Sequence, residues 1–277
     1  MKYLRATIRL FALGGVMAGY YLLWLAGLAV VFAFPAASRK WRNWIFGGWA
    51  RASAHILGMK IDVRNQPPAA PFLLVANHLS YVDIVLLRSQ MDCAFVAKSE
   101  VAAWPILGLV CRSMNTIFVD RKRKRDTLKA IPRIEQAMTQ ESGVVLFAEG
   151  TSTDGRTVTP FRSSLLEGAA KNHLPVHYAC ISYAAPATER PAHESICWWG
   201  EMTFPGHIFS LLQLREFEAR LVFGSTPIVA GDRRVLAAQL WSAVSAQFTP
   251  VVAQRYGENE ASSSKPRISN LLGGHTK

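Results

Sequence analysis

The sequence predicts an α/β fold, a layered mixed sheet flanked by helices, preceded by an N-terminal membrane helix and an amphipathic interfacial helix. Two observations support this prediction. Short apolar runs alternate with helical patterns after residue 58, which is typical of a layered domain with a buried sheet. An uncharged apolar run occupies residues 11–34. With 277 residues, half of them hydrophobic, the chain can bury one substantial core.

Residues 11–34 predict a membrane anchor. As a helix this run would be roughly 36 Å long, enough to cross a hydrocarbon core. It is longer than the apolar region of a signal peptide, about 7–15 residues, although PAAS at 35–38 resembles a cleavage site. Basic residues flank both ends, so the positive-inside rule gives no orientation. A segment that dips into one leaflet fits as well as one that spans.

Residues 41–58 continue with tryptophan and arginine at helical spacing. One predicted face carries Trp41, Trp44, Ile45, Trp49, Ala52 and Ile56. This composition is typical of a helix at the lipid–water interface, and the alternative is a helix that faces the core of the next domain. We therefore expect anchoring helices over 1–58 and an α/β domain over 59–255. Residues 256–277 form a polar, Ser/Gly-rich tail that we expect to be disordered.

Apolar runs bounded by turn residues predict the strands of the α/β domain, and longer periodic segments predict its helices. Strands are expected at 59–63, 72–76, 93–97, 115–119, 143–148, 174–183, 196–201 and 217–224. Helices are expected at 80–90, 101–112, 123–141, 161–171 and 232–248. The cysteines, Cys93, Cys111, Cys180 and Cys197, form no Cys-x-x-Cys pair and lie in apolar surroundings. We interpret them as reduced, buried and structural.

His78 and Asp83 form the first candidate catalytic pair. His78 lies on the expected turn between a buried strand and a helix, and Asp83 lies in the first turns of that helix. A histidine that removes a proton needs a carboxylate to orient the ring and stabilise its charged form. Two alternatives stay open. Ser80 with Asp83 also matches a helix-capping pattern, and chance alone gives about 0.2 His/Asp pairs at this spacing.

Three more polar stretches follow predicted strands. They contain Lys98 after the strand at 93–97, Asp120 and Arg121 after 115–119, and Glu149, Gly150 and Thr151 after 143–148. The sites of α/β folds lie at strand ends, so these side chains would join His78 and Asp83 at one edge of the sheet. Such a set fits acyl or phosphoryl chemistry on an anionic substrate.

The order of these blocks resembles a known family. Asn-His-x4-Asp, Lys-x-Glu…Pro-x-x-Gly, Phe-Val-Asp-Arg, Phe-x-Glu-Gly-Thr and Leu-Pro-Val follow one another between about residues 70 and 185. This series resembles the glycerophospholipid acyltransferases, and most of all the bacterial 1-acyl-sn-glycerol-3-phosphate (lysophosphatidic acid) acyltransferases. The resemblance implies a membrane-associated enzyme of phospholipid biosynthesis. It also implies an inner (cytoplasmic) membrane location, with the catalytic domain on the cytoplasmic side.

The resemblance further implies a mechanism. His78 would be the general base that deprotonates the hydroxyl of a lyso-lipid, with Asp83 orienting the ring. The hydroxyl would attack the thioester of acyl-CoA or acyl-carrier protein, so no cofactor beyond this acyl donor is expected. No covalent acyl-enzyme is needed, in agreement with the lack of a Gly-x-Ser-x-Gly motif. The head group of the acceptor would be held by Lys98, Arg121, Glu149, Gly150 and Thr151.

The Glu-Gly-Thr block departs from the family pattern, Phe-Pro-Glu-Gly-Thr-Arg, at two positions. Ala148 replaces the proline and Ser152 replaces the arginine. The second change removes a bidentate anion contact. Lys98 and Arg121, helped by Arg156 or Arg162, could still bind lysophosphatidic acid, which we rank first. The alternative acceptor is lyso-ornithine lipid, whose zwitterionic head needs fewer cations.

Other function classes are less well supported by the sequence. The net charge of +12 indicates an anionic partner, but the basic run at 121–125 lacks interleaved aromatics, and the anchor favours anionic lipid over nucleic acid. His173 and His177 lack a nearby third metal ligand, and Pro175 opposes a helical pair. We therefore expect neither nucleic acid nor metal. A catalytically inactive lipid-binding module and a released periplasmic hydrolase remain as rivals.

Overall fold

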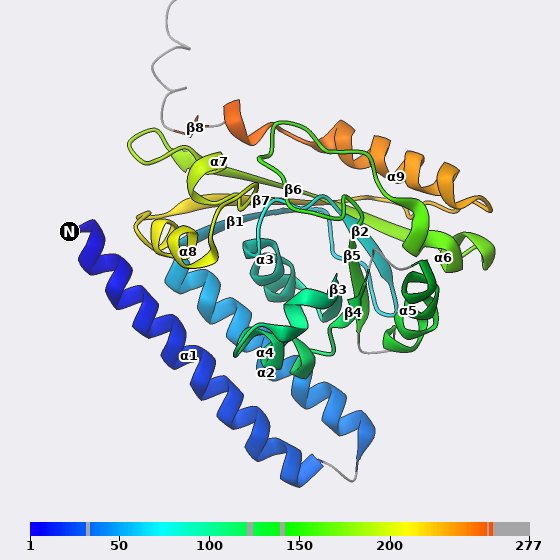
Figure 1. The fold of residues 1–277 in the computed structure, drawn as a ribbon, viewed down its shortest axis with the longest axis horizontal. Coiled ribbons are helices and arrows are strands. Elements are labelled where there is room, and N and C mark those ends of the chain that lie inside the picture. The colour runs from blue at the N-terminus through cyan, green and yellow to red at the C-terminus, as the bar shows by residue number, and fades with distance from the viewer. Residues whose placement is uncertain (32–33, 121–123, 139–141, 254, 257–277) are drawn as a thin grey trace, which may run out of the picture.

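The computed structural model describes residues 1–31, 34–120, 124–138, 142–253 and 255–256, and its centre is a mixed β-sheet between two layers of helices (Figure 1). The strands of the sheet are, in spatial order, β1 (Met59–Arg64), β7 (Phe217–Phe223), β6 (Val176–Pro186), β2 (Leu73–Ala76), β5 (Gly143–Phe147), β3 (Cys93–Lys98) and β4 (Ile117–Val119). The short strand β8 (Arg255–Tyr256) pairs with the end of β6. The predicted fold class is confirmed.

The middle of the sheet is parallel and fully buried. Every residue of β2 and β5 is buried, as expected for strands that are covered on both faces. β2 runs parallel to both neighbours, so that Ala76 lies opposite Phe147 of β5 and Ala179 of β6. β7 is antiparallel to β6 and alternates between buried and half-buried residues. The carboxyl ends of β2, β5, β3 and β4 therefore lie side by side at one edge of the sheet.

Helices cover the two faces of the sheet with separate apolar clusters. One face carries α2 (Pro35–Leu57), α3 (Val82–Gln90), α4 (Leu107–Ser113), α7 (Ala192–Ser195) and α8 (Phe204–Leu212). The other carries α5 (Lys124–Ala137), α6 (Glu167–Lys171) and α9 (Arg233–Gln247). Three short 3₁₀ helices, η1 (Ser99–Ala103), η2 (Ser163–Leu166) and η3 (Val251–Ala253), lie in the connections between these elements. The five helices predicted for the α/β domain match α3, η1 with α4, α5, η2 with α6, and α9.

The prediction of a strand at 196–201 is wrong. This segment is a turn between α7 and α8. Its Ile196 and Cys197 are fully buried in the apolar cluster that these helices share, whereas Trp199 is exposed. The backbone N–H of Trp198 donates to the carbonyl of Leu79 at 2.8 Å. Cys111 also differs from expectation, since it is only half-buried, whereas the other three cysteines are buried.

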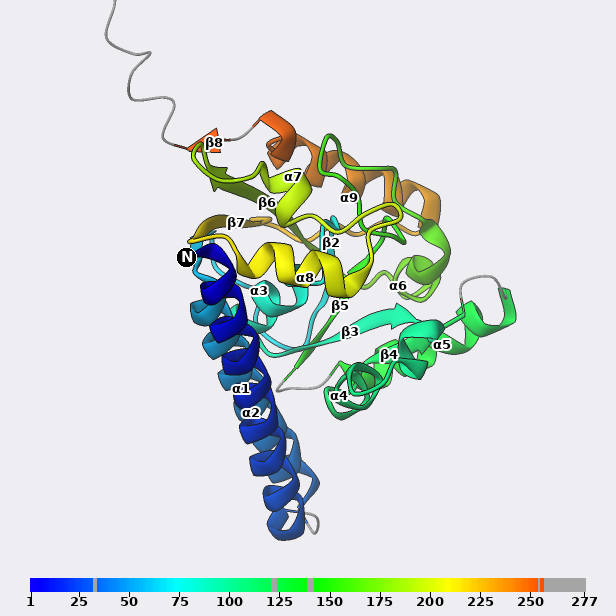
Figure 2. The same cartoon turned by 60° about the vertical axis from the view of Figure 1, so that its left-hand side comes forward.

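An antiparallel pair of long helices precedes the sheet and extends beyond it (Figures 1 and 2). The first, α1 (Lys2–Val31), starts nine residues before the predicted anchor. Its Arg5 donates to the carbonyl of Gln213, and its Arg9 donates to that of Leu214, both just after α8. Cations are favoured beside the carbonyls at the end of a helix. Among the described residues, one helix, over Lys2–Leu28, is long and apolar enough to cross a membrane.

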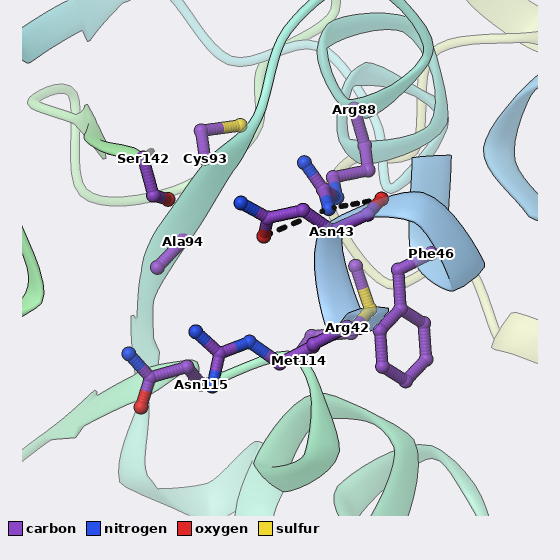
Figure 3. Close-up of a pocket in the computed structure, with 9 residues that line it drawn as sticks. All are labelled: Arg42, Asn43, Phe46, Arg88, Cys93, Ala94, Met114, Asn115 and Ser142. Carbon is purple, nitrogen blue, oxygen red and sulfur yellow. Dashed lines mark hydrogen bonds between the residues drawn. The ribbon is translucent and has the colours of Figure 1, made fainter. Parts of the chain in front are cut away.

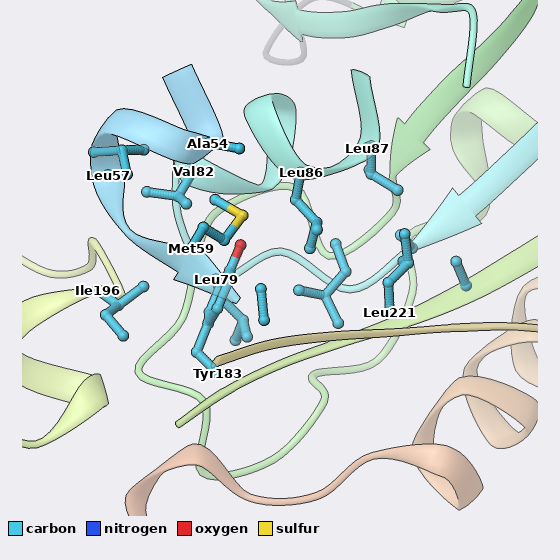
Figure 4. Close-up of a cluster of buried hydrophobic side chains, with 14 of the residues drawn as sticks. Ala54, Leu57, Met59, Leu79, Val82, Leu86, Leu87, Tyr183, Ile196 and Leu221 are labelled. Atoms are coloured by element: carbon cyan, nitrogen blue, oxygen red, sulfur yellow. The ribbon is translucent and has the colours of Figure 1, made fainter. Parts of the chain in front are cut away.

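The second helix, α2, faces the core with a stripe that differs from the predicted one. The buried stripe contains Ile45, Phe46, Ala50, Ala54 and Leu57, whereas Trp44 is 58% exposed. Figure 4 shows Ala54 and Leu57 beside Val82 of α3, with Tyr183 and Leu221 of the sheet below them. One face of α2 is therefore part of the domain core. Trp41 and Trp49 pack against that core, and Trp44 and Arg51 are exposed.

A polar contact fixes α2 against α3 at the amino end of β3. Arg88 of α3 donates to the backbone carbonyl of Asn43 at 2.9 Å and to Asp92 at 2.7 Å. Figure 3 shows this contact at a small pocket that Arg42, Cys93 and Asn115 also line. Because β3 and β2 both run parallel to β5, this pocket lies at the opposite edge of the sheet from His78.

Candidate active site

The turn between β2 and α3 carries His78 and is anchored on both sides. Asn77, which follows β2, donates its side-chain amide to the carbonyl of Ile181 at 2.9 Å and accepts from the N–H of Ile181 at 2.8 Å. This pair of hydrogen bonds extends the backbone hydrogen bonding between β2 and β6 by one side chain. The side chain of Asn77 is fully buried. It therefore fixes where the strand ends and where His78 emerges.

Asp83 holds the imidazole of His78 from the first turn of α3. Its Oδ2 lies 2.7 Å from Nδ1 of His78 and also accepts from the backbone N–H groups of Leu79 and Ser80, at 2.7 and 3.1 Å. The carboxylate is fully buried, and buried charges need such partners. Both interpretations of the sequence pattern thus hold in part, because the same carboxylate orients His78 and binds backbone N–H groups at the start of the helix.

Tyr183 of β6 supplies the fourth donor to Asp83. Its hydroxyl donates to Oδ1 at 2.7 Å. Burial, and then the adjacent Asp83 carboxylate, raise the pKa of Tyr183 well above its ordinary value. The phenol therefore stays protonated and remains a donor. The sequence reasoning missed Tyr183, which is 100 residues from Asp83 along the chain and occurs in an apolar strand without any local motif.

The ring of His78 leaves one nitrogen available. Its Nδ1 faces Asp83, so in the neutral ring this nitrogen carries the proton and Nε2 keeps a lone pair. The ring stacks on Phe147 of β5, with centroids 4.1 Å apart and planes 15° apart. The side chain remains 21% exposed. This geometry suits a general base that receives a proton from a bound hydroxyl.

Glu149, directly after β5, binds the peptide of His78 and a neighbouring loop. Its Oε1 accepts from the backbone N–H of His78 at 2.7 Å, and its Oε2 accepts from the N–H and hydroxyl of Thr159 at 3.0 and 2.6 Å. Only 3% of Glu149 is exposed. Burial raises the pKa of this carboxyl, and hydrogen bonds from Thr159 and His78 partly offset that effect. Both oxygens are thus occupied within the protein, in contrast to the expected head-group contact.

The other predicted site residues lie around this centre. Gly150 follows Glu149 with a φ of +84°, a conformation that favours glycine, and Thr151 is exposed beside it. Thr153 returns to the turn of His78 by donating its N–H to the His78 carbonyl at 3.0 Å. Lys98 is exposed at the carboxyl end of β3. Arg121 lies outside the described residues.

The fold and this pair define an α/β protein with a histidine–carboxylate pair at the carboxyl edge of its sheet. Comparison with known proteins agrees. The acyltransferase family model matches residues 60–182. A crystal structure of the 1-acyl-sn-glycerophosphate (LPA) acyltransferase PlsC from Thermotoga maritima shares the fold, with a TM-score of 0.62 and 19% identity, covering 89% of this chain and 98% of that one.

Curated relatives extend this similarity to most of the chain. The lyso-ornithine lipid O-acyltransferase of Brucella abortus (strain 2308) is 30% identical, covering 87% of this chain and 94% of that protein. The enzyme of the same description from Rhodobacter capsulatus is 32% identical, covering 85% and 88%. The 1-acyl-sn-glycerol-3-phosphate acyltransferase of Neisseria meningitidis serogroup B is 24% identical, covering 60% and 65%. The chain belongs to this family of lyso-lipid acyltransferases, and the resemblance seen in its sequence is confirmed.

Proposed function

We propose that this acyltransferase moves a fatty acyl chain from acyl-CoA or acyl-carrier protein to the hydroxyl of lyso-ornithine lipid. The extent of the similarity carries this choice, because relatives with that activity in their names align with 85% or more of this chain at 30–32% identity. Ser152 supports it, since a zwitterionic head needs fewer cations than a phosphate monoester. Lysophosphatidic acid, ranked first on the sequence alone, becomes the second candidate, supported by Lys98 and Arg121.

His78 acts as the general base in the proposed reaction. Its Nε2 takes the proton of the acceptor hydroxyl while the oxygen attacks the thioester carbonyl. Collapse of the tetrahedral intermediate forms the ester bond, breaks the thioester bond and releases the thiolate, which recovers the proton from the imidazolium. Asp83 stabilises the charged ring throughout. Glu149 is a positioning residue that holds the His78 peptide, and Lys98, Gly150, Thr151 and Arg121 contact the acceptor.

We infer that α1 holds this site at a membrane surface. The outer side of α1 exposes large apolar side chains, among them Leu4, Phe11 and Leu22, which suit contact with lipid tails. The exposed Trp44 and Arg51 of α2 suit the interface. We infer that the enzyme is held at the cytoplasmic face of the inner membrane, where both proposed acyl donors occur.

A side-by-side assay tests the proposed function. The purified full-length protein in detergent is given labelled acyl-CoA or acyl-carrier protein, with lyso-ornithine lipid or lysophosphatidic acid as acceptor. We expect transfer to lyso-ornithine lipid, and a loss of about 10²–10⁴-fold in His78→Ala, the typical contribution of a general base. Transfer to lysophosphatidic acid alone would reverse the ranking, and near-normal turnover by His78→Ala would overturn the mechanism.

A further inference from the structure

The site needs a cation for the anionic group of its acceptor, and the family position for that cation is occupied by Ser152. Both candidate acceptors carry an oxyanion, a carboxylate in the ornithine head group or a phosphate monoester. The loop that follows Thr151 offers two arginines, Arg156 and Arg162. Their surroundings differ, and this difference decides which of them can bind the acceptor.

Arg156 is paired within its own loop. Its Nε lies 2.8 Å from Oδ2 of Asp154, and its backbone N–H donates to Oδ1 of the same carboxylate at 3.1 Å. The charge of the guanidinium is therefore largely balanced by a neighbour two residues away. An exposed pair of this kind adds little stability, but it leaves little positive charge for a ligand.

Arg162 is brought to the catalytic turn by the backbone of the loop. Its N–H donates to the carbonyl of Ala148 at 2.8 Å, and Thr159, three residues earlier, is bound to Glu149. The segment 159–162 thus lies along the segment 148–150. Because Glu149 also holds the backbone N–H of His78, Arg162 is fixed to the same structural unit as the general base.

The side chain of Arg162 lies over Gly150. A Cβ atom built on Gly150 would come within 2.9 Å of Nε of Arg162 and within 3.1 Å of its Cζ. The missing side chain of Gly150 therefore leaves room for the guanidinium beside the Glu-Gly-Thr turn. Arg162 is exposed, and no hydrogen bond or ion pair engages its guanidinium among the residues that the structure describes.

We propose that Arg162 binds the oxyanion of the acyl acceptor. It would take the role of the family's arginine, whose position is occupied here by Ser152. Its planar guanidinium can donate two parallel hydrogen bonds to a carboxylate or to a phosphate. The inference rests on the proposed function, because it assumes a lyso-lipid acceptor at His78. It adds that acceptor recognition comes from a residue ten positions after the family position, on the returning segment of the same loop.

Steady-state kinetics of Arg162→Gln test the proposal, with acceptor concentration varied in mixed micelles. We expect KM for the acceptor to rise about tenfold to a hundredfold, as for a lost charge-assisted hydrogen bond, while KM for the acyl donor stays unchanged. Arg162→Lys should recover part of the loss. Adding Ser152→Arg to Arg162→Gln should restore acceptor binding. Arg234→Gln, which removes an exposed charge on α9, is the matched control and should behave as the wild type.

The choice of acceptor separates the two sources of the oxyanion. A larger rise in KM for lyso-ornithine lipid assigns Arg162 to a carboxylate, and a larger rise for lysophosphatidic acid assigns it to a phosphate. An unchanged KM for both acceptors, or a rise in Arg156→Gln instead, overturns the proposal. If the wild-type protein transfers acyl chains to neither acceptor, the proposed function fails first, and this outcome is seen before any variant is measured.

Discussion

At the scale of single residues, the site is organised around the buried carboxylate of Asp83. Four donors reach it: the His78 ring, two backbone N–H groups and the Tyr183 hydroxyl. A buried carboxylate needs such partners, and these four donors satisfy both of its oxygens. Tyr183 differs from the other donors because it comes from β6, on the far side of the turn. It couples the catalytic pair to the centre of the sheet.

Tyr183→Phe tests this coupling. The change removes the phenolic hydroxyl, the donor to Oδ1, and leaves the ring that packs on Phe217. Oδ1 of Asp83 then loses its donor, so the carboxylate is held less firmly against the His78 ring. We expect about a tenfold loss of kcat/KM at neutral pH, the effect of one hydrogen bond to a charged group, with an unchanged melting temperature. A fall in melting temperature with unchanged kcat/KM would indicate a purely structural role.

At the scale of elements, the active site is made by two turns that bind each other. The turn after β5 binds both backbone polar groups of His78, since Glu149 accepts from its N–H and Thr153 donates to its carbonyl. Glu149 of the same turn also binds the loop that follows, by accepting from the N–H and hydroxyl of Thr159. The geometry at His78 therefore depends on the pairing of β2 with β5, which places Ala76 opposite Phe147.

Glu149→Gln should weaken this junction. The new NH₂ group cannot accept, so the N–H of His78 or the donors of Thr159 lose their partner, at a cost of about 1–3 kcal/mol. The folded-state pKa of Glu149 is raised by burial. Its contribution to stability is hence complete below the unfolded-state pKa and is lost as pH rises through the folded-state value. As pH rises from the unfolded-state pKa through the folded-state pKa of Glu149, the wild type should lose stability and the variant should not. Thermal melts of both proteins at several pH values measure this, and parallel pH curves would contradict it.

At the scale of the whole molecule, the anchor and the catalytic domain share one core. α1 contacts α8 through Arg5 and Arg9, and α2 contributes buried side chains to the apolar cluster beneath α3. The helical pair projects from one side of the sheet (Figure 2). α2 supplies more of the buried side chains of this core than α1, whose Ala6 is buried in the same cluster and whose Met17 and Trp24 pack against it.

Two truncations distinguish these roles. Deleting residues 1–34 should release the protein from membranes in high salt while α2 still covers the sheet. Deleting residues 1–58 also removes Ile45, Phe46 and Leu57, whose burial contributes about 1.5–3 kcal/mol each, a sum comparable with the usual net stability of a domain. We expect that chain to aggregate. Sedimentation and circular dichroism provide the measurements. A 1–34 deletion that stays on membranes would place a second anchor in the rest of the chain.

The sequence by itself determined seven of the eight predicted strands, the long apolar helix near the N-terminus and the order of the family's sequence blocks. Apolar periodicity and strand ends are local properties of the sequence. His78 and Asp83 are five positions apart, so their spacing already suggested their contact. The sequence did not show which face of α2 is buried, because tryptophan suits both a membrane interface and a protein core. The strand predicted at 196–201 failed for a similar reason, since apolar content alone does not say whether a segment joins the sheet or packs on helices.

Only the tertiary structure decided which distant side chains complete the site. Tyr183 reaches Asp83 because β6 lies beside β2, and strand order is not encoded in any local pattern. Glu149 binds the backbone of His78, and the backbone carries no sequence signal for a partner. Arg156 and Arg162 look equivalent along the chain. One is neutralised by Asp154 and the other lies over Gly150, because the path of the loop in space, and not the distance along the sequence, sets which charges meet.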